Sequence, residues 1–388
     1  MSEVRVNNLS NENNTGGPTI SGITTYSSTN FFVPPQGDTS TRPQSCPNGS
    51  LRFNTDTAKL EYFRGETIGW VTVEAELTAP LGTSTTGVGH RMLFMGGTHD
   101  QGSPHLSNKI EFITIPTLGN VTDFGDLVAE EQEGAFASNH LRGVYFGGDP
   151  ADNDIEFVTF SSTGNAADFG DCTTTSKSGA SCSDRNRGVM ILGANNNVID
   201  HIQFSTTGNA KDFGDTSMIN SAGSGASSST RGVFAIGSSD ANYKNILEYI
   251  TISTLGDSSD FGDLTRSGVH CNSYSSATRG VWHSGYQYPA SPNFMNVIDY
   301  VTIATTGNAI DFGDAGLGGF GAGGSSPTRG VAGSGYFQAA PTGETGGFTN
   351  IIEFTQIATT GNATDFGDMS EKNVTVKVDQ TVTEVYNV

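Results

Sequence analysis

The sequence has few positive charges, and they are not gathered into a stripe. Its 388 residues include 19 Lys and Arg against 40 Asp and Glu, which gives a formal net charge of −21. A polyanion would be repelled by such a chain, so we do not expect it to bind nucleic acid. No apolar run approaches the ~18–20 residues that a membrane-spanning helix needs, and the N-terminus lacks the apolar stretch of a secretory signal. We therefore predict no membrane insertion.

Cysteine is scarce, and its spacing does not suggest a metal site. The four cysteines are Cys46, Cys172, Cys182 and Cys271. Only Cys172 and Cys182 are close enough in sequence to form a bridge, and the pattern favours free thiols in a reducing cytosol. The seven histidines also lack metal-ligand spacing or a nucleophile partner: His90, His99, His105, His140, His201, His270 and His283. We predict no metal ion and no cofactor.

What the sequence does contain is the tetrapeptide Asp-Phe-Gly-Asp, repeated six times every 44 to 54 residues. The six copies begin at Asp123, Asp168, Asp212, Asp260, Asp311 and Asp365. Each copy follows an Ile-Glu-Phe-like run and a Thr-Gly-Asn-Ala-like turn. An Arg-Gly-Val-like run opens each unit, at Arg142, Arg187, Arg231, Arg279 and Arg329, with a weaker match at Arg91. Repetition at this period predicts an array of one supersecondary unit.

Large length variation falls at one place in the unit. The Ile-Glu-Phe-like run always begins 13 residues before the tetrapeptide, and the next Arg follows 18 or 19 residues after it. The interval between the Arg and the Ile-Glu-Phe-like run, in contrast, ranges from 12 to 23 residues. Insertions in repeat proteins map to loops on one face, which is often the binding face. We therefore expect a packed frame with one variable edge.

Four short strands are predicted in each unit. In the second unit these are 142–148, 155–160 and a segment around 168–171, followed by a Ser/Ala/Gly-rich stretch at 179–182 whose small side chains suit a crowded position. Four strands per unit of about 48 residues are typical of a propeller blade. We predict an all-β protein with a six-bladed β-propeller of these repeats. The Gly-Gly pair that follows the Arg-Gly-Val-like run resembles kelch blades, although the Trp and Tyr of that motif are missing. A trimeric β-helix or β-solenoid is the alternative fold.

The repeated charges are interpreted as structural. Because Arg187 and its equivalents lie at a fixed offset from the preceding tetrapeptide, we expect an Arg–carboxylate bridge between neighbouring strands in every unit. A calcium ladder built from Asp and Asn oxygens is the less favoured reading, because the repeat lacks a dense ligand loop.

Enzymatic activity is not predicted, and no catalytic residue is nominated. Asp-Phe-Gly also occurs in protein kinases, but here it recurs in a β-only context without the other kinase motifs. A glycosidase needs carboxylates at unique positions, whereas those of this frame are repeated. A carbohydrate-active enzyme with a divergent site stays open as an alternative.

Aromatic residues among Gly, Ser, Asn and Pro make two of the variable loops candidates for ligand contact, since flat rings give contact area at low entropic cost. The candidate rim residues are Tyr286, Tyr288, Phe294, Tyr336, Phe337 and Phe348. The alternative is that these rings only cover the edges of the blades.

Residues 1–76 do not follow the repeat and are expected to form a small β-rich module. A hairpin of 50–54 and 59–63 is predicted there, closed by Trp70. Residues 77–90 are expected to be a linker, 91–370 the propeller, and 371–388 a closing strand that pairs with the first blade or with a neighbour.

The pattern from Arg42-Pro43 through Ser50-Leu-Arg-Phe-Asn54 to Trp70 resembles a segment of fibre-like virion proteins of tailed marine phages, particularly those that infect cyanobacteria. The Thr-Gly-Asn-Ala-x-Asp-Phe-Gly-Asp units are similar to repeats of the same group. The resemblance implies a virion structural protein assembled in the host cytoplasm, attached to other virion proteins through residues 1–76 and forming a homo-oligomer. A tail-fibre-like appendage whose rim binds a host surface glycan or protein is expected. A capsid decoration or knob protein is the alternative.

Overall fold

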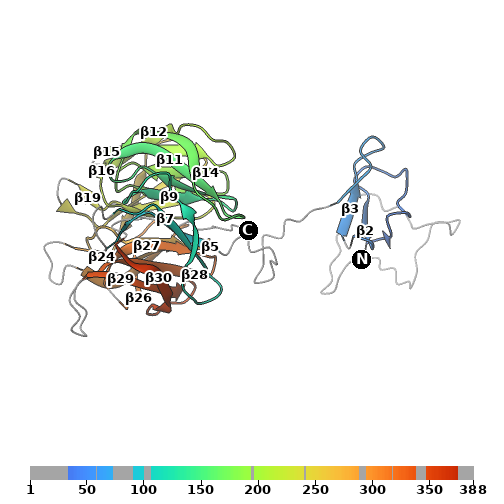
Figure 1. Cartoon of the computed structure of the whole chain (residues 1–388). Helices are drawn as coiled ribbons and strands as arrows, with labels where there is room; N and C mark the ends of the chain where they lie inside the picture. The colour runs from blue at the N-terminus through green and yellow to red at the C-terminus, as the bar shows by residue number, and fades with distance from the viewer. Residues whose placement is uncertain are drawn as a thin grey trace, which may run out of the picture. The chain divides into compact units, whose positions relative to one another are not determined.

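The chain is built from β-strands and turns. The computed structural model describes residues 34–57, 59–72, 91–99, 106–193, 196–239, 242–287, 294–316, 318–337 and 347–374. These residues contain no helix, so the all-β prediction is confirmed, and none of them forms a helix long and apolar enough to cross a membrane. The chain divides into two compact parts, Met1–Leu77 and Thr78–Val388 (Figure 1). The expected linker at 77–90 lies outside the described residues.

The first part, called the N-terminal module and described over 34–72, is one four-stranded sheet. Its strands lie in the order β1 (Gln36–Gly37), β2 (Leu51–Asn54), β3 (Lys59–Phe63) and β4 (Trp70–Thr72). The predicted hairpin is therefore confirmed as β2 and β3, which pair antiparallel. β1 pairs parallel to β2, and residues 38–50 form the connection between these two strands.

A polar network fills the inside of this module. The Arg42 guanidinium forms an ion pair with the buried Glu61 carboxylate, which also accepts a 2.8 Å hydrogen bond from Asn54 Nδ2. Trp70 Nε1 donates to the carbonyl of Pro43 at 2.9 Å, and the Arg52 guanidinium lies over the Trp70 ring. The hydrogen bond from Arg42 lowers the pKa of Glu61. Five residues of the segment from Arg42 to Trp70 thus take part in this network with Glu61: Arg42, Pro43, Arg52, Asn54 and Trp70.

In the second part, called the repeat domain, the described residues form six antiparallel sheets of three to five strands, in addition to a small two-stranded sheet. Sheet 1 has β5 (Arg91–Met95), β7 (Lys109–Thr114) and β8 (Thr122–Asp126); sheet 2 has β9 (Ala135–Ser138), β10 (Arg142–Phe146), β11 (Asp152–Thr159) and β12 (Ala167–Ser176); sheet 3 has β13 (Ala180–Ser183), β14 (Arg187–Ile191), β15 (Asn196–Gln203) and β16 (Lys211–Asn220). Sheet 4 has β17 (Ser224–Ser227), β18 (Arg231–Ala235), β21 (Ile246–Thr251) and β22 (Ser259–Asp263); sheet 5 has β23 (Asn272–Ser275), β24 (Arg279–Tyr286), β25 (Phe294–Thr302) and β26 (Ile310–Asp314); sheet 6 has β27 (Gly319–Ser325), β28 (Arg329–Phe337), β29 (Gly347–Gln356) and β30 (Thr364–Val374). All four strands predicted for the second unit are present, and each sheet pairs them in chain order.

The small-residue strand belongs to the sheet that follows it. β13 pairs with β14 and not with β12, so each complete sheet begins with this strand. Its predicted crowded position is confirmed, because the small strands of neighbouring sheets hydrogen-bond one another through serine. Ser183 Oγ donates to the Ser138 carbonyl at 2.7 Å, and Ser227 Oγ donates to the Ser183 carbonyl at 2.9 Å. The same bond joins Ser325 to Ser275.

The Thr-Gly-Asn-Ala-like turn binds the tetrapeptide of the preceding sheet. The Gly307 and Ala309 amides donate to the carbonyls of Phe261 and Asp263, each at 2.7 Å. The Asp263 amide donates in return to Asn308 Oδ1 at 3.2 Å. The same Gly amide to Phe carbonyl bond joins Gly164 to Phe124, Gly208 to Phe169, Gly256 to Phe213, Gly361 to Phe312 and Gly119 to Phe366. The contacts run from each sheet to the next, and the last pair joins sheet 6 to sheet 1.

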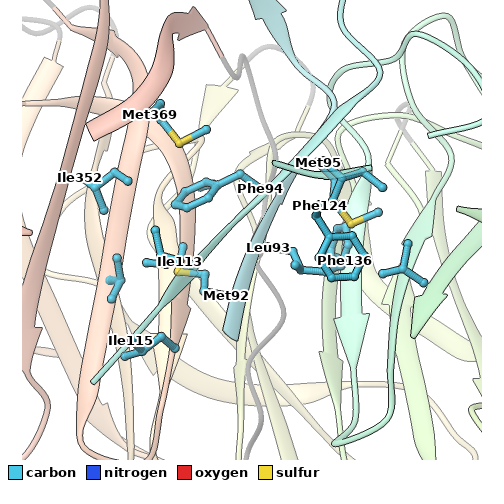
Figure 2. Packing of buried hydrophobic residues seen from close by; sticks show 14 of the residues in the cluster. Met92, Leu93, Phe94, Met95, Ile113, Ile115, Phe124, Phe136, Ile352 and Met369 are labelled. Carbon is cyan, nitrogen blue, oxygen red and sulfur yellow. The ribbon is translucent and has the colours of Figure 1, made fainter. Parts of the chain in front are cut away.

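An apolar core connects the two ends of the repeat domain. In Figure 2, Met369 and Ile352 of sheet 6 lie on one side of β5, whereas Phe124 and Phe136 of sheets 1 and 2 lie on the other. β30 continues to Val374 and pairs through its end with β6 (Thr98–His99) beside sheet 1. The expected closing strand is therefore the end of β30 over 371–374, and residues 375–388 lie outside the described part. The last two short strands are β19 (Ser238–Ser239) and β20 (Asn242–Tyr243).

Candidate functional site

The repeated arginines do not pair with the repeated aspartates, so the expected Arg–Asp bridge is wrong. Arg231 Nη1 instead donates to the carbonyl of Ile303 in the following sheet at 2.9 Å, and its guanidinium lies 4.4 Å from the centre of the Tyr249 ring. The same bond joins Arg91 to Phe160, Arg142 to Phe204, Arg187 to Ile252, Arg279 to Ile357 and Arg329 to Ile115. The first Asp of each tetrapeptide is exposed: Asp123, Asp168, Asp212, Asp260, Asp311 and Asp365. Each of these guanidinium groups therefore bonds to a backbone carbonyl and lies over an aromatic ring, and does not pair with a carboxylate.

The carboxylate that links neighbouring sheets is a different one, in the Ile-Glu-Phe-like run. Asp299 of β25 accepts hydrogen bonds from the amide and the hydroxyl of Thr265 in sheet 4, at 3.2 and 2.7 Å. Equivalent bonds join Glu156 to Val128, Asp200 to Thr173, Glu248 to Ser217 and Glu353 to Gly316, and Glu111 of sheet 1 lies beside Ser370 of sheet 6. The sequence pattern contained this acidic position in every repeat, but did not show that it is buried.

Burial raises the pKa of four of these carboxyl groups, namely Glu111, Glu156, Asp200 and Asp299. The hydrogen bonds from the preceding sheet act in the opposite direction, because they stabilise the ionised form.

One position of the sheet 3 frame departs from the pattern. His201 stands where the other sheets have Phe or Tyr, and burial followed by the charge of Arg187 lowers its pKa.

Two of the candidate rim residues meet at the end of a long hairpin in sheet 5. β10, β14 and β18 have five residues, whereas β24 has eight and β28 has nine. The extra length of β24 places Tyr286 opposite Phe294 of β25, with ring centres 5.1 Å apart. The hairpin of sheet 6 has the same design, in which Tyr336 lies opposite Phe348. Sheets 5 and 6 therefore extend arms from the variable edge, and each arm carries an aromatic pair.

A third ring joins the arm of sheet 5. Tyr243 of β20 packs edge-to-face on Tyr286, with ring centres 5.9 Å apart, and all three rings are half-buried. Sequence reasoning missed Tyr243, because it lies in the shorter variable loop of sheet 4. Tyr288 lies outside the described residues, as do the side chains of Tyr336 and Phe337.

A buried arginine holds the base of the sheet 5 arm. Arg266 Nη2 donates to the carbonyls of Ser284 and Val297, which lie on the two strands of the hairpin. Its Nε lies 3.8 Å from the carboxylate of Asp299, which links sheets 4 and 5. The Arg266 guanidinium therefore contacts both this carboxylate and the two strands of the arm. The amides of Val269 and Tyr286 each donate to the other's carbonyl at 2.9 Å, which holds β24 on the side away from β25. The arm is thus a braced element and not a free loop.

Two other clusters contain buried titratable groups. Glu131 lies beside the half-buried Asp152, and burial followed by the charge of Asp152 raises the pKa of Glu131 to about 8. Tyr274 Oη lies 3.3 Å from His283 Nδ1 and 2.8 Å from Thr355 Oγ1, between sheets 5 and 6. Glu131, Tyr274 and His283 are at most 4% exposed, so these clusters cross-link neighbouring segments.

No arrangement for a metal ion is found in the part of the chain that the structure describes, where no group of three or more His, Cys, Asp or Glu is suitably placed. All four cysteines are unbridged, and Cys172 and Cys182 lie in the cores of different sheets. The aromatic arms are therefore the best candidate for a ligand site.

The comparison with known proteins adds no family to this picture. No family model matches the sequence. No curated protein is significantly similar to it.

Proposed function

We propose that this chain is a structural protein of a tailed-phage virion, a tail-fibre-like appendage that touches the host surface. The N-terminal module attaches it to other virion proteins, and the variable edge of the repeat domain binds a host surface glycan or protein. The observation that carries the binding role is the pair of long arms in sheets 5 and 6. Aromatic pairs are placed there on the only segment of the repeat whose length varies widely, where insertions mark a binding face.

The repeat domain is proposed to be a closed six-bladed propeller in which each sheet is one blade. Three sets of contacts support this: the turn-to-tetrapeptide amide bonds, the arginine-to-carbonyl bonds and the buried carboxylate bonds. Every set runs from each sheet to the next and includes a pair between sheets 6 and 1. The small-residue strands lie beside one another, as strands nearest a propeller axis do.

The location is tested by immunogold electron microscopy of purified virions, with an antibody against the repeat domain. Gold at the tail or fibre tips supports host recognition. Gold over the head would contradict it and make the protein a decoration protein.

The binding role is tested on the full chain with Tyr286→Ala combined with Phe294→Ala. We expect this variant to lose most of its binding to host cells while the chain stays folded, with a modest fall in melting temperature because packed rings are removed. Leu118→Ala is the matched control, since Leu118 is 60% exposed and lies away from the arms in a turn of sheet 1. Equal binding by both variants would remove the arms from the proposal. Release of reducing ends from host polysaccharide by the purified chain would indicate an enzyme instead.

A capsid decoration or knob protein is the second candidate. The edge-to-face packing of Tyr243, Tyr286 and Phe294 on one another favours it, because rings that only cover the end of a blade would pack in this way.

A further inference from the structure

The arm of sheet 5 begins at a β-bulge. The pairing of β24 with β25 shifts between His283 and Gly285, where Ser284 lies opposite two residues, Asn296 and Val297. Ser284 has a φ of +55°, a conformation that residues other than glycine seldom adopt. A bulge interrupts the ladder of cross-strand hydrogen bonds, so backbone groups at this place need partners from outside the two strands.

The side chain of Arg266 fills this bulge. Its Nη2 donates to the Ser284 carbonyl at 2.5 Å and to the Val297 carbonyl at 2.9 Å, which is one carbonyl from each strand. The side chain is only 7% exposed, and its Nε lies 3.8 Å from the Asp299 carboxylate. A guanidinium holds several donors in one plane, so a single side chain can bond to two strands at once. Arg266 therefore fixes the path of both strands where the arm leaves the sheet.

An arginine occurs at this place in only one of the six units. Arg266 is the third residue after its tetrapeptide, and the other units have Ala129, Thr174, Met218, Leu317 and Glu371 there. The arm of sheet 6 has the same bulge, with a register shift between Gly333 and Gly335. The unit before it has Leu317 in place of Arg266, and a leucine side chain has no hydrogen-bond donor. The two arms are thus alike in backbone but differ in this brace.

The braced arm carries the cluster of three rings. Tyr286 follows the bulge by two residues and lies opposite Phe294, while Tyr243 of sheet 4 packs on Tyr286. All three rings are half-buried, so each keeps part of its surface open to solvent. A change in the path of β24 would move Tyr286 away from Tyr243, because the two belong to different sheets. A ligand that contacts this cluster needs the arm in one position, and an arm that holds it only part of the time binds more weakly in proportion.

We propose that the binding site is the ring cluster of Tyr243, Tyr286 and Phe294 on the arm of sheet 5, and that Arg266 is its positioning residue. The buried guanidinium does not touch the ligand and acts by holding the two strands of the arm. This inference rests on the proposed function, since it takes the arms to bind the host surface. It adds which of the two arms binds and what prepares that arm for its ligand.

The test is a double-mutant cycle on the full chain, with binding to host cells as the measurement. Arg266→Met removes the donors but leaves an unbranched side chain in the bulge, and we expect it to weaken binding about 10-fold. It should weaken binding no further in a chain that already carries Tyr286→Ala and Phe294→Ala, called the ring variant. Arg266→Lys should lose less than Arg266→Met, because an ammonium can still donate to a carbonyl.

Two controls separate the arm of sheet 5 from the rest of the domain. Arg279 lies at the opposite end of β24 and also bonds to a backbone carbonyl, that of Ile357, at 2.8 Å. Arg279→Met should therefore lower the melting temperature and leave binding unchanged. Phe348→Ala, on the arm of sheet 6, should bind like the wild type. A loss of binding in Phe348→Ala equal to that of the ring variant would overturn the choice of arm.

Hydrogen-exchange mass spectrometry distinguishes failure of this inference from failure of the proposed function. In Arg266→Met the amides of 284–286 and 294–297 should exchange faster, and those of β23 should not change. Unchanged exchange in the arm, equal binding by Arg266→Met and the wild type, or a loss that adds to that of the ring variant would each overturn the positioning role. If the wild type does not bind host cells, the proposed function fails, and exchange still shows whether Arg266 holds the arm. If Arg266→Met does not fold, Arg266→Lys is used for both measurements.

Discussion

The N-terminal module and the repeat domain differ in how many apolar side chains they bury. Among its described residues the module buries three polar side chains, Arg52, Asn54 and Glu61, beside one apolar side chain, Phe63. The repeat domain buries apolar clusters within and between its sheets and exposes the repeated Asp of each tetrapeptide. The module also depends on contacts that occur once, whereas the repeat domain makes each kind of contact six times. Loss of a contact that occurs once can therefore destabilise the whole module. Loss of one copy of a repeated contact affects only the junction between two sheets.

The largest effect is expected at the contact between neighbouring sheets. Gly262 has a φ of +147°, and a Cβ there would lie 2.5 Å from the Gly307 carbonyl oxygen. Gly262→Ala should therefore lower the free energy of unfolding by about 4 kcal/mol, from backbone strain and steric overlap together. Urea unfolding measures the change. Gly307→Ala is the control: its φ is +151° but no atom lies within 4 Å, so about 1–2 kcal/mol is expected. Equal losses would contradict the close approach of these turns.

A slightly smaller loss is expected from the buried charge of the module. Glu61→Gln keeps a hydrogen-bond acceptor but leaves Arg42 and the buried Arg52 without their negative partner, which costs about 3 kcal/mol. Hydrogen-exchange mass spectrometry should show faster exchange in the peptides of β2 to β4 and no change in the repeat domain. Glu66→Gln, at an exposed position, should leave both parts unchanged. Faster exchange in the repeat domain would contradict the separation of the two parts.

The arginine contact should contribute less, because Arg231 is only partly buried and its loss removes one hydrogen bond and one ring contact. Arg231→Ala leaves the Ile303 carbonyl without its donor and removes the stacking on Tyr249, for a loss of about 2 kcal/mol. Thermal unfolding measures this, and binding to host cells should not change. Arg231→Lys should lose less, since an ammonium can still reach the carbonyl. An unchanged melting temperature for Arg231→Ala would show that the bond contributes nothing.

A separate effect concerns pH. Burial raises the pKa of Glu131 from its ordinary value of 4.5 to about 8, so its protonated form is favoured in the folded state. This contribution to stability is fully present below pH 4.5 and is lost as the pH rises through about 8. The melting temperature should therefore fall between pH 5 and pH 9, and it should fall less steeply in Glu131→Gln. Parallel pH profiles for the two proteins would show that Glu131 does not titrate in this range.

The regular part of the fold could be predicted from the sequence. The fixed spacings of the Arg-Gly-Val-like run, the Ile-Glu-Phe-like run and the tetrapeptide predicted the strands of each sheet, because constant intervals and alternation reflect packed strands. The partner of each charge could not be predicted. Arg231 and Asp212 lie at the fixed offset that suggested a bridge, but Arg231 reaches Ile303, 72 residues further along the chain. Which carbonyl lies next to Arg231 depends on how the sheets are placed beside one another, and the sequence spacing does not show this.

The candidate site was predicted in part. Tyr286 and Phe294 were chosen for their place in a variable loop, and the structure brings them together as a cross-strand pair. Tyr243 was missed, because only the neighbouring position of sheets 4 and 5 brings its ring to Tyr286. Arg266 was also missed, since it occurs in one unit only and its role at the base of the arm depends on where Ser284 and Val297 lie.

The sequence by itself determined the repeated unit, its four strands and the position where length varies, because these follow from local periodicity and turn residues. Tertiary structure alone decided three further features. It assigned the small-residue strand to the following sheet, made the Ile-Glu-Phe carboxylate the buried link between sheets, and left Leu51 of the N-terminal module exposed. Each of these depends on which strands become neighbours, and that choice is made by packing between segments far apart in the chain.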